Sequence, residues 1–390
     1  MSQTAQALDP ARRAAIAPFI AMDVKREATL LEQGGAGIVH MEVGEPSAPP
    51  PRRVREAAIA ALAGQPVGYT DALGLTSLRE RIARHYREAY GQDVDPQRVA
   101  VTTGSSGGFI MAFLALFDAG ARVAIQNPGY PAYRNIFGAL GLEAVDLPVD
   151  SSNGFAVTAA AVEKADDAQK LDGLLLMSPA NPTGAMQSAE SLREIAETCA
   201  RRGIRFISDE IYHGLTYDRP AQTALAFSDR AVVVNSFSKY YCMTGWRIGW
   251  LVVPSELTRT VERLQQSLAI APPTLSQIAA QAAFESIEEL EAVKDGYRRN
   301  REILLNGLPG LGLDELAPAD GAFYLYADVS RFTDDSTRFC HDLLHRAGIA
   351  ATPGVDFDPV LGHRAMRLSY AGAEAGMVEA LRRLKGFLRK

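Results

Sequence analysis

Residues 173–184 read GLLLMSPANPTG and join an apolar run to a constrained turn. The run 173–177 has no polar side chain, which is typical of a strand that is buried on both faces of a sheet. The same combination of apolar strand, turn and helical pattern recurs along the chain, and it predicts further strands at 38–43, 99–103, 122–126, 205–208, 231–236 and 249–253. Repeated strand–helix units favour a mostly parallel sheet in a three-layer α/β/α sandwich.

Helical patterns separate these strands, and a different organisation follows them. Helices are expected at 54–62, 75–90, 108–117, 133–140 and 189–201. Beyond Pro254 we expect a long helical stretch at 256–290, broken at Pro272 and Pro273, and then helices at 292–305, 337–347 and 376–388 with strands at 323–328 and 366–369. This later part predicts a second, smaller α+β domain.

The composition excludes several classes of protein. The chain has 390 residues and is 47% apolar, which is enough to bury sizeable cores and rules out a disordered protein. The formal net charge is −6 and no basic run is present, so binding to nucleic acid or to an anionic membrane is not expected. The longest apolar runs end well before the ~18 residues that a membrane-spanning helix needs.

The N-terminus and the cysteines predict a reducing, cytoplasmic location. Residues 1–10 lack the charged segment and apolar stretch of a signal peptide. Cys199, Cys242 and Cys340 stand in unrelated contexts, without CxxC spacing or a Cys/His cluster, so no metal site is expected.

In an open α/β sheet, ligands bind beyond the carboxyl ends of the strands, so the residues that follow each strand are the candidates. Gly104–Gly108 could bring backbone N–H groups and a helix dipole to a phosphate, or could be a plain tight turn. Asn181 stands between two prolines. Its amide could be held in a fixed orientation toward a ligand, or the segment could be an ordinary turn. Asp209 precedes Tyr212 by three residues and could be a cofactor partner or a helix N-cap.

Lys239 closes another apolar strand and is flanked by the hydroxyls of Ser236 and Ser238. Partial desolvation at such a position disfavours the ammonium and supplies a neutral amine nucleophile, although most lysines are solvated surface groups. Arg247 lies nearby in sequence and could bind a phosphate through a bidentate contact. A phosphate site, an aimed amide, an Asp–Tyr pair and such a lysine together match what pyridoxal 5′-phosphate requires.

The chain resembles the class I/II aminotransferases, which are fold-type I pyridoxal-phosphate enzymes of the aspartate aminotransferase-like group. The segments that carry the resemblance occur in the family order and span ~330 residues. They are Val43–Pro46, Gly68–Thr70, Thr103–Ser106, Asn127–Tyr130, Pro179–Gly184, Asp209–Tyr212, Ser236–Lys239, Gly245–Gly249, Gly321–Tyr324 and Arg367–Ala371.

The resemblance implies a role for each matched residue around the cofactor. Lys239 would form the Schiff base and move the proton between the substrate Cα and the cofactor, while Asp209 would pair with the pyridine nitrogen. Tyr212 and Asn181 would bond the phenolic oxygen, and Tyr130 would stack on the ring. The phosphate would be held by Ser105, Ser106, Ser236, Ser238 and Arg247.

The resemblance also implies a substrate site and an assembly. Arg367 would bind the substrate α-carboxylate, assisted by Asn181 and the Gly44 backbone, and Tyr69 would reach the phosphate of a neighbouring subunit in a homodimer. It further implies a large cofactor-binding domain at 46–284 and a small domain built from 1–45 and 285–390.

The expected activity is transfer of an α-amino group from an L-amino acid to a 2-oxo acid by a ping-pong mechanism. A carbon–sulfur β-lyase or related lyase on the same scaffold remains an alternative. An effector-sensing module of a transcription regulator is disfavoured, because the family pattern already starts at 18–34 and leaves no room for a DNA-binding region. Residues 18–22 and 268–272 are apolar, so a neutral, aliphatic or aromatic amino donor is expected in preference to aspartate.

Overall fold

The computed structural model describes residues 9–64 and 66–389. Its centre is a seven-stranded sheet in the order β2-β8-β7-β6-β5-β3-β4, in which β8 runs antiparallel to its neighbours and the other pairs are parallel. The strands are β2 (Val99–Thr102), β3 (Arg122–Asn127), β4 (Glu143–Pro148), β5 (Gly173–Met177), β6 (Arg205–Asp209), β7 (Val232–Ser236) and β8 (Gly249–Val252). Every residue of β5 and β7 is buried, as the apolar runs predicted.

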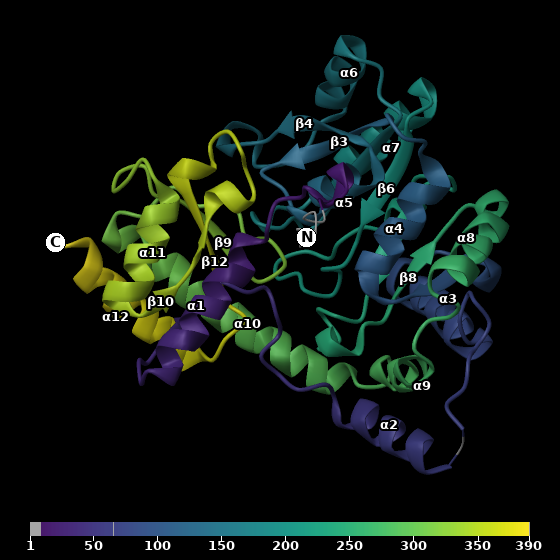
Figure 1. The fold of residues 1–390 in the computed structure, drawn as a ribbon, viewed down its shortest axis with the longest axis horizontal. Helices are drawn as coiled ribbons and strands as arrows, with labels where there is room; N and C mark the ends of the chain where they lie inside the picture. Colours follow the sequence, from purple (N-terminus) through teal and green to yellow (C-terminus); the bar gives the residue numbers. More distant parts are fainter. Residues whose placement is uncertain (1–8, 65, 390) are drawn as a thin grey trace, which may run out of the picture.

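Helices pack on both faces of this sheet (Figure 1). The helices of this part of the chain are α2 (Arg52–Gly64), α3 (Thr76–Tyr90), α4 (Gly104–Leu116), α5 (Ala132–Leu140), α6 (Ala159–Ala168), α7 (Ala189–Arg202), α8 (Ser255–Leu268) and α9 (Thr274–Ala283). The three-layer α/β/α arrangement with a mostly parallel sheet is thus confirmed. Helix α2 lies at the edge of the molecule, where it packs on α9.

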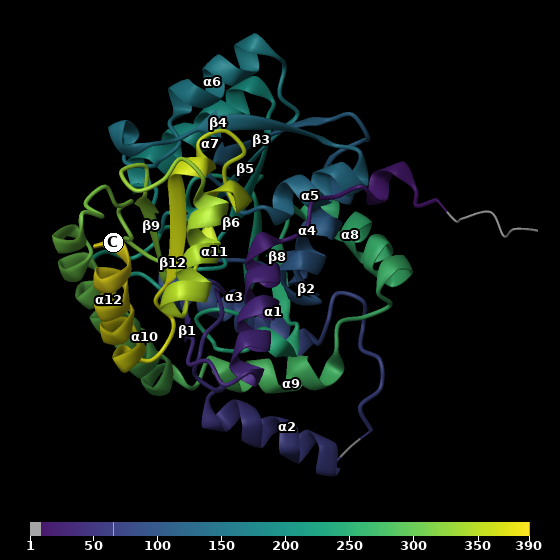
Figure 2. The same ribbon diagram turned by 60° about the vertical axis from the view of Figure 1, so that its left-hand side comes forward.

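Two smaller sheets contain the remaining strands (Figure 2), and one of them joins a segment near the N-terminus to a segment near the C-terminus. One is antiparallel, in the order β11-β12-β9, and in the other β1 pairs in parallel with β10. These strands are β1 (Val39–His40), β9 (Tyr324–Asp328), β10 (Ile349–Ala350), β11 (Thr352–Pro353) and β12 (Ala365–Ser369), and the helices around them are α1 (Ile20–Gln33), α10 (Ile287–Gly307), α11 (Ser336–Ala347) and α12 (Glu374–Leu388). The expected smaller α+β part therefore contains segments from both chain ends.

Short 3₁₀ turns complete the elements, at Arg12–Ala14, Pro96–Arg98, Ser151–Asn153, Ala224–Ala226, Thr244–Trp246, Pro309–Leu311, Gly354–Asp356 and Gly362–Arg364. In the part of the chain that the structure describes, no helix has both the length and the apolar character needed to cross a bilayer.

The structure corrects several expectations about individual elements. The strand expected at 38–43 is reduced to β1, and α1, α6 and β4 were not anticipated. The turn expected at Gly104–Gly108 is the first part of α4. Glycine disfavours helix, but an added Cβ at Gly108 would lie 3.3 Å from Leu251, so the absence of a side chain allows α4 to approach the sheet.

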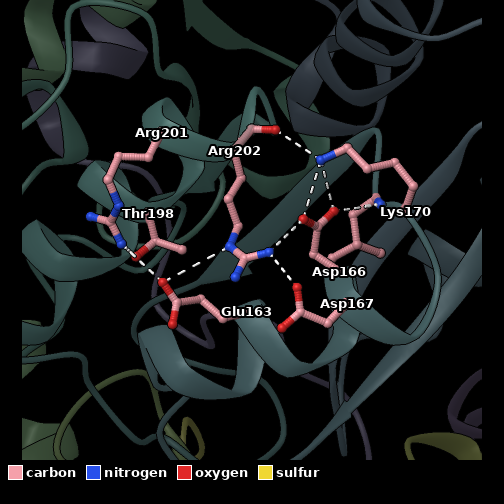
Figure 3. Close-up of polar contacts among 8 residues, drawn as sticks. Glu163, Asp166, Asp167, Lys170, Thr198, Arg201 and Arg202 are labelled. Carbon is pink, nitrogen blue, oxygen red and sulfur yellow. Dashed lines mark hydrogen bonds and ion pairs between the residues drawn. The ribbon is translucent and has the colours of Figure 1, made fainter.

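An ion-pair cluster joins α6 to α7 on the outer surface (Figure 3). Asp166 is almost fully buried and accepts hydrogen bonds from Lys170 Nζ (3.0 Å), Arg202 Nη1 (3.0 Å) and the Leu171 amide (2.9 Å). Arg202 also binds Asp167 (2.7 Å). These partners outweigh the cost of burial and lower the pKa of Asp166, so the folded state favours the ionised carboxylate.

Candidate active site

A cavity of about 580 Å³ lies at the carboxyl ends of β2, β3, β5, β6 and β7. This is the place where an open α/β sheet binds its ligands, and the volume suits a small organic molecule. Its wall includes most of the residues that the sequence singled out, namely Gly44, Ser105, Ser106, Tyr130, Asn181, Asp209, Tyr212, Ser238, Lys239, Arg247 and Arg367. Gly44 and Arg367, which are 323 positions apart in the chain, therefore meet at one site.

Lys239 follows β7 and extends into this cavity, where Nζ donates to the Gly44 carbonyl at 2.6 Å. Burial and the nearby positive charge of Arg367 lower the pKa of Lys239 to about 8. A substantial fraction of the amine is therefore neutral near pH 8, as a nucleophile or a general base requires.

Asp209 is the last residue of β6, and its side chain is buried. Burial raises the pKa of Asp209 to about 6, although hydrogen bonds from the Tyr133 hydroxyl and the Ile211 amide act in the opposite direction. No arginine or lysine of the described residues forms an ion pair with this carboxylate. The site therefore holds a buried acidic group that a cationic ligand atom would stabilise.

Arg367, on β12, is a further cationic residue on the cavity wall and is 4% exposed. Its Nη1 donates to Asn181 Oδ1 at 3.0 Å, and its guanidinium lies over the rings of Tyr324 (4.4 Å) and Phe357 (4.6 Å). Its buried Nε has no hydrogen-bond partner among the described residues. Its Nη2 donates to the Glu42 carbonyl, so rings and hydrogen bonds fix the guanidinium in one orientation, as binding of a carboxylate requires.

The N-terminus of α4 forms an anion-binding corner of the cavity. Ser105 and Ser106 lie in its first turn, next to backbone N–H groups that have no partner within the helix. Gly104 has φ +67°, and a Cβ there would collide with the guanidinium of Arg247. Only glycine therefore lets Arg247 approach this turn, and the combination of cation, hydroxyls and helix dipole fits a phosphate.

Two of the expected site residues do not line the cavity of this chain. Ser236 is buried behind the wall, where its hydroxyl contacts the Ser238 hydroxyl (2.8 Å) and the Ile248 carbonyl (3.0 Å). Tyr69 is 82% exposed and lies away from the cavity. Its expected role in a neighbouring subunit stays a prediction.

The structure adds residues that sequence reasoning missed. Tyr133 donates to Asp209, and Tyr324 shares a hydrogen bond of 2.6 Å with Tyr212. Phe357 packs against Arg367, and Asp356 reaches the cavity from the 3₁₀ turn between β11 and β12. Tyr133 follows Tyr130 by three residues, a spacing that could have marked it, whereas nothing local marks the loop at 354–358.

The chemical groups around the cavity fit pyridoxal 5′-phosphate. An amine with a lowered pKa, a buried carboxylate without an ion-pair partner among the described residues, the Tyr212 hydroxyl and a phosphate corner surround one cavity, and each matches a different group of that cofactor. A second cationic site, at Arg367, remains for the carboxylate of a substrate.

Comparison with known proteins gives the family. Residues 36–384 match the model of aminotransferase class I and II. The chain is 49% identical to the valine–pyruvate aminotransferase of Mycobacterium tuberculosis, over 97% of this chain and 98% of that one. It is 34% identical to the arginine–pyruvate transaminase of Pseudomonas aeruginosa, over 93% of each.

Solved structures agree with this result. A crystal structure of an aminotransferase from M. tuberculosis superposes with a TM-score of 0.96 at 48% identity, covering 98% of this chain and 100% of that one. The aspartate aminotransferase of Thermus thermophilus with maleate gives a TM-score of 0.92 at 32% identity, with the same coverage. The family resemblance in the sequence is therefore confirmed: the chain belongs to the class I and II aminotransferases, pyridoxal-phosphate-dependent enzymes that move an amino group from an amino acid to a 2-oxo acid.

Proposed function

We propose that this aminotransferase binds pyridoxal 5′-phosphate in the cavity described above. Lys239 would attach to the aldehyde, and Asp209 would pair with the ring nitrogen. Tyr212 and Asn181 would bond the phenolic oxygen and Tyr130 would stack on the ring. The phosphate would lie at the α4 N-terminus, with Ser105, Ser106, Ser238 and Arg247, while Ser236 would position Ser238.

When bound, the cofactor supplies an electron sink that acidifies the Cα proton of the amino acid. Arg367 would hold the α-carboxylate, and its contact with Asn181 would fix the orientation of that group. Once the amine of the amino acid has taken its place at the aldehyde, the freed Lys239 amine, with its lowered pKa, would remove the Cα proton and later return it to a different carbon. The carboxylate of Asp209 would favour the charged form of the ring nitrogen.

We further propose that the amino donor is a neutral, aliphatic amino acid such as valine. The observation that carries this proposal is the apolar wall of Phe19, Ala21 and Met22, which α1 and the segment before it place on the cavity. Such a wall leaves a distal carboxylate unpaired, at a cost of several kcal/mol. It gains ~25 cal/mol per Å² from an aliphatic side chain.

The charged groups at the same end of the cavity support this choice. Lys25 is the cation of α1 on the cavity wall, and its Nζ lies 3.4 Å from Glu45 Oε2. Asp356 also faces the cavity and would repel an acidic side chain. For the acceptor we propose pyruvate, because relatives at 49% and 34% identity are named as pyruvate transaminases.

A half-reaction panel tests both proposals. The holoenzyme is mixed with valine, leucine, methionine, phenylalanine, arginine or aspartate, and the absorbance change from the pyridoxal to the pyridoxamine form is followed. The pyridoxamine form is then mixed with pyruvate or 2-oxoglutarate. We expect valine to exceed aspartate at least tenfold in kcat/KM; the opposite ratio would refute the donor proposal and leave the family unchanged.

We also propose a homodimer, with the domain boundaries expected from the sequence, 46–284 against 1–45 and 285–390. Exposed apolar side chains near the projecting helix α2 support a buried partner surface there, at Ile59, Leu62, Val67 and Tyr69. Sedimentation at assay concentration tests the assembly, and an active monomer would contradict it. Cytoplasmic location stays a prediction.

A further inference from the structure

Two histidines and a glutamate converge on the outer surface of the smaller part of the protein, away from the cavity. His341 and His345 stand one turn apart on α11, so they share a face of that helix. Glu27 belongs to α1, which lies beside α11 (Figure 2). The three side chains are 56%, 36% and 42% exposed, in the order His341, His345 and Glu27.

The ligand atoms of these three residues point to one place. Nε2 of His345 lies 2.7 Å from Glu27 Oε1, and Nε2 of His341 lies 3.8 Å from the same oxygen. Within residues 9–64 and 66–389, this is the one group in which three His, Cys, Asp or Glu ligand atoms lie within 4.8 Å of one another. The separation of 318 positions between Glu27 and His345 hides the group from a search of the sequence.

The two imidazoles lie close together and face the same carboxylate. The two imidazole rings are 4.3 Å apart, and both direct Nε2 at a single carboxylate oxygen. A divalent cation placed between these groups would bind both imidazoles and the carboxylate at once.

We infer that Glu27, His341 and His345 form a binding site for a late first-row divalent metal ion, of which Zn²⁺ is the test case. Two histidines at i and i+4 on a helix with one carboxylate are a ligand set that zinc accepts, and solvent supplies the remaining position. Nδ1 of His341 lies 3.6 Å from Asp342 Oδ1, so a carboxylate stands near the imidazole nitrogen that would not bind the metal.

Occupation of this site would hold α1 against α11. The same α1 carries Ala21, Met22 and Lys25 on the cavity wall, and its first amides bind the Asp356 carboxylate. A metal at Glu27 would add a second attachment further along the helix. We therefore expect the metal to alter the KM for the amino donor without touching the groups that perform the chemistry.

The direct test is calorimetric titration of substrate-free, tag-free holoenzyme with Zn²⁺. We expect one saturable equivalent per chain, weakened at least tenfold in His345→Gln and in Glu27→Gln. His363→Gln is the matched control, because His363 is an exposed histidine elsewhere in the same part of the protein, bonded to the Val360 carbonyl. Circular dichroism verifies that the variants are folded.

Absence of saturable binding to the wild-type chain would overturn the inference, as would equal loss of affinity in His363→Gln. Co²⁺ provides an independent reading, since its visible absorption reports imidazole ligation, and the double variant His341→Gln/His345→Gln should abolish that signal. Donor KM is then measured with and without Zn²⁺. A change in the wild type that disappears in the double variant supports the coupling to α1, and an unchanged KM in the wild type contradicts it.

Discussion

The ion-pair cluster between α6 and α7 and the cavity at the strand ends each contain a buried aspartate. The two environments shift the pKa of that aspartate in opposite directions. Burial opposes ionisation of Asp166, but the Leu171 amide, Lys170 and Arg202 outweigh it and hold the pKa of Asp166 below its usual value. Burial likewise opposes ionisation of Asp209, and there the hydrogen bonds from Tyr133 and Ile211 are insufficient, so its pKa rises to about 6.

This difference shows whether each carboxylate is paired within the protein. The chain itself supplies two cations to Asp166, and the result is a stabilising cluster (Figure 3). Among residues 9–64 and 66–389, no arginine or lysine forms such a pair with Asp209, although the residue is buried. A charge that folding leaves uncompensated in a cavity marks a place for a ligand, and this distinction separates structural from functional polar groups in this protein.

The largest expected effect distinguishes Lys239 from Lys170. Lys239→Ala should reduce transamination on the order of 10⁴-fold, because both the attachment of the cofactor and the proton transfer are lost. Lys170→Ala, in the ion-pair cluster, should leave the rate unchanged and lower the stability by at most about 1 kcal/mol, since that lysine is 58% exposed. Steady-state kinetics and thermal unfolding of both variants provide the comparison. Equal activities of the two variants would contradict the role proposed for Lys239.

A second pair of substitutions compares two arginines. Arg367→Lys should reduce kcat/KM by about 30- to 1000-fold, or about 2–4 kcal/mol, because lysine cannot reproduce a bidentate contact held between two rings. Arg202→Lys should alter only the unfolding midpoint. If Arg367→Lys retained full kcat/KM, a different residue would have to bind the substrate carboxylate.

A smaller effect is expected for the hydroxyl that supports Asp209. Tyr133→Phe removes a hydrogen bond to the carboxylate, worth about 1 kcal/mol, and should raise the pKa of Asp209 above about 6. Carbon-13 NMR of the Asp209 carboxyl in the cofactor-free chain measures this directly. A pKa that stays the same or falls would show that the hydroxyl does not stabilise the ionised form.

The sequence predicted the part of the site that depends on strand ends, because apolar strands are local signals and their carboxyl ends must meet at one edge. Asn181, Asp209 and Lys239 were found in this way. Asp356 and Phe357 were not found, since they come from an irregular loop whose contact with α1 spans 336 positions. The helical start at Gly104 was missed because packing against the sheet overrides the low helix propensity of glycine.

The most direct test applies one substitution in both regions, Asp166→Asn and Asp209→Asn, and measures the free energy of unfolding of the cofactor-free chain between pH 4 and pH 8. The folded-state pKa of Asp209 is raised from 3.8 to about 6, so its penalty is absent below 3.8, grows as the pH rises to about 6, and then stays constant. The folded-state pKa of Asp166 is lowered, so its contribution is present above 3.8 and is lost only at more acidic pH.

We therefore predict that at pH 8 Asp209→Asn is more stable than the wild type by roughly 1–3 kcal/mol and has lost most of its activity as holoenzyme. At the same pH, Asp166→Asn should be less stable by about 1–3 kcal/mol and fully active. Destabilisation of the cofactor-free chain by Asp209→Asn, to the same extent as by Asp166→Asn, would contradict the proposal that Asp209 is left uncompensated for a ligand.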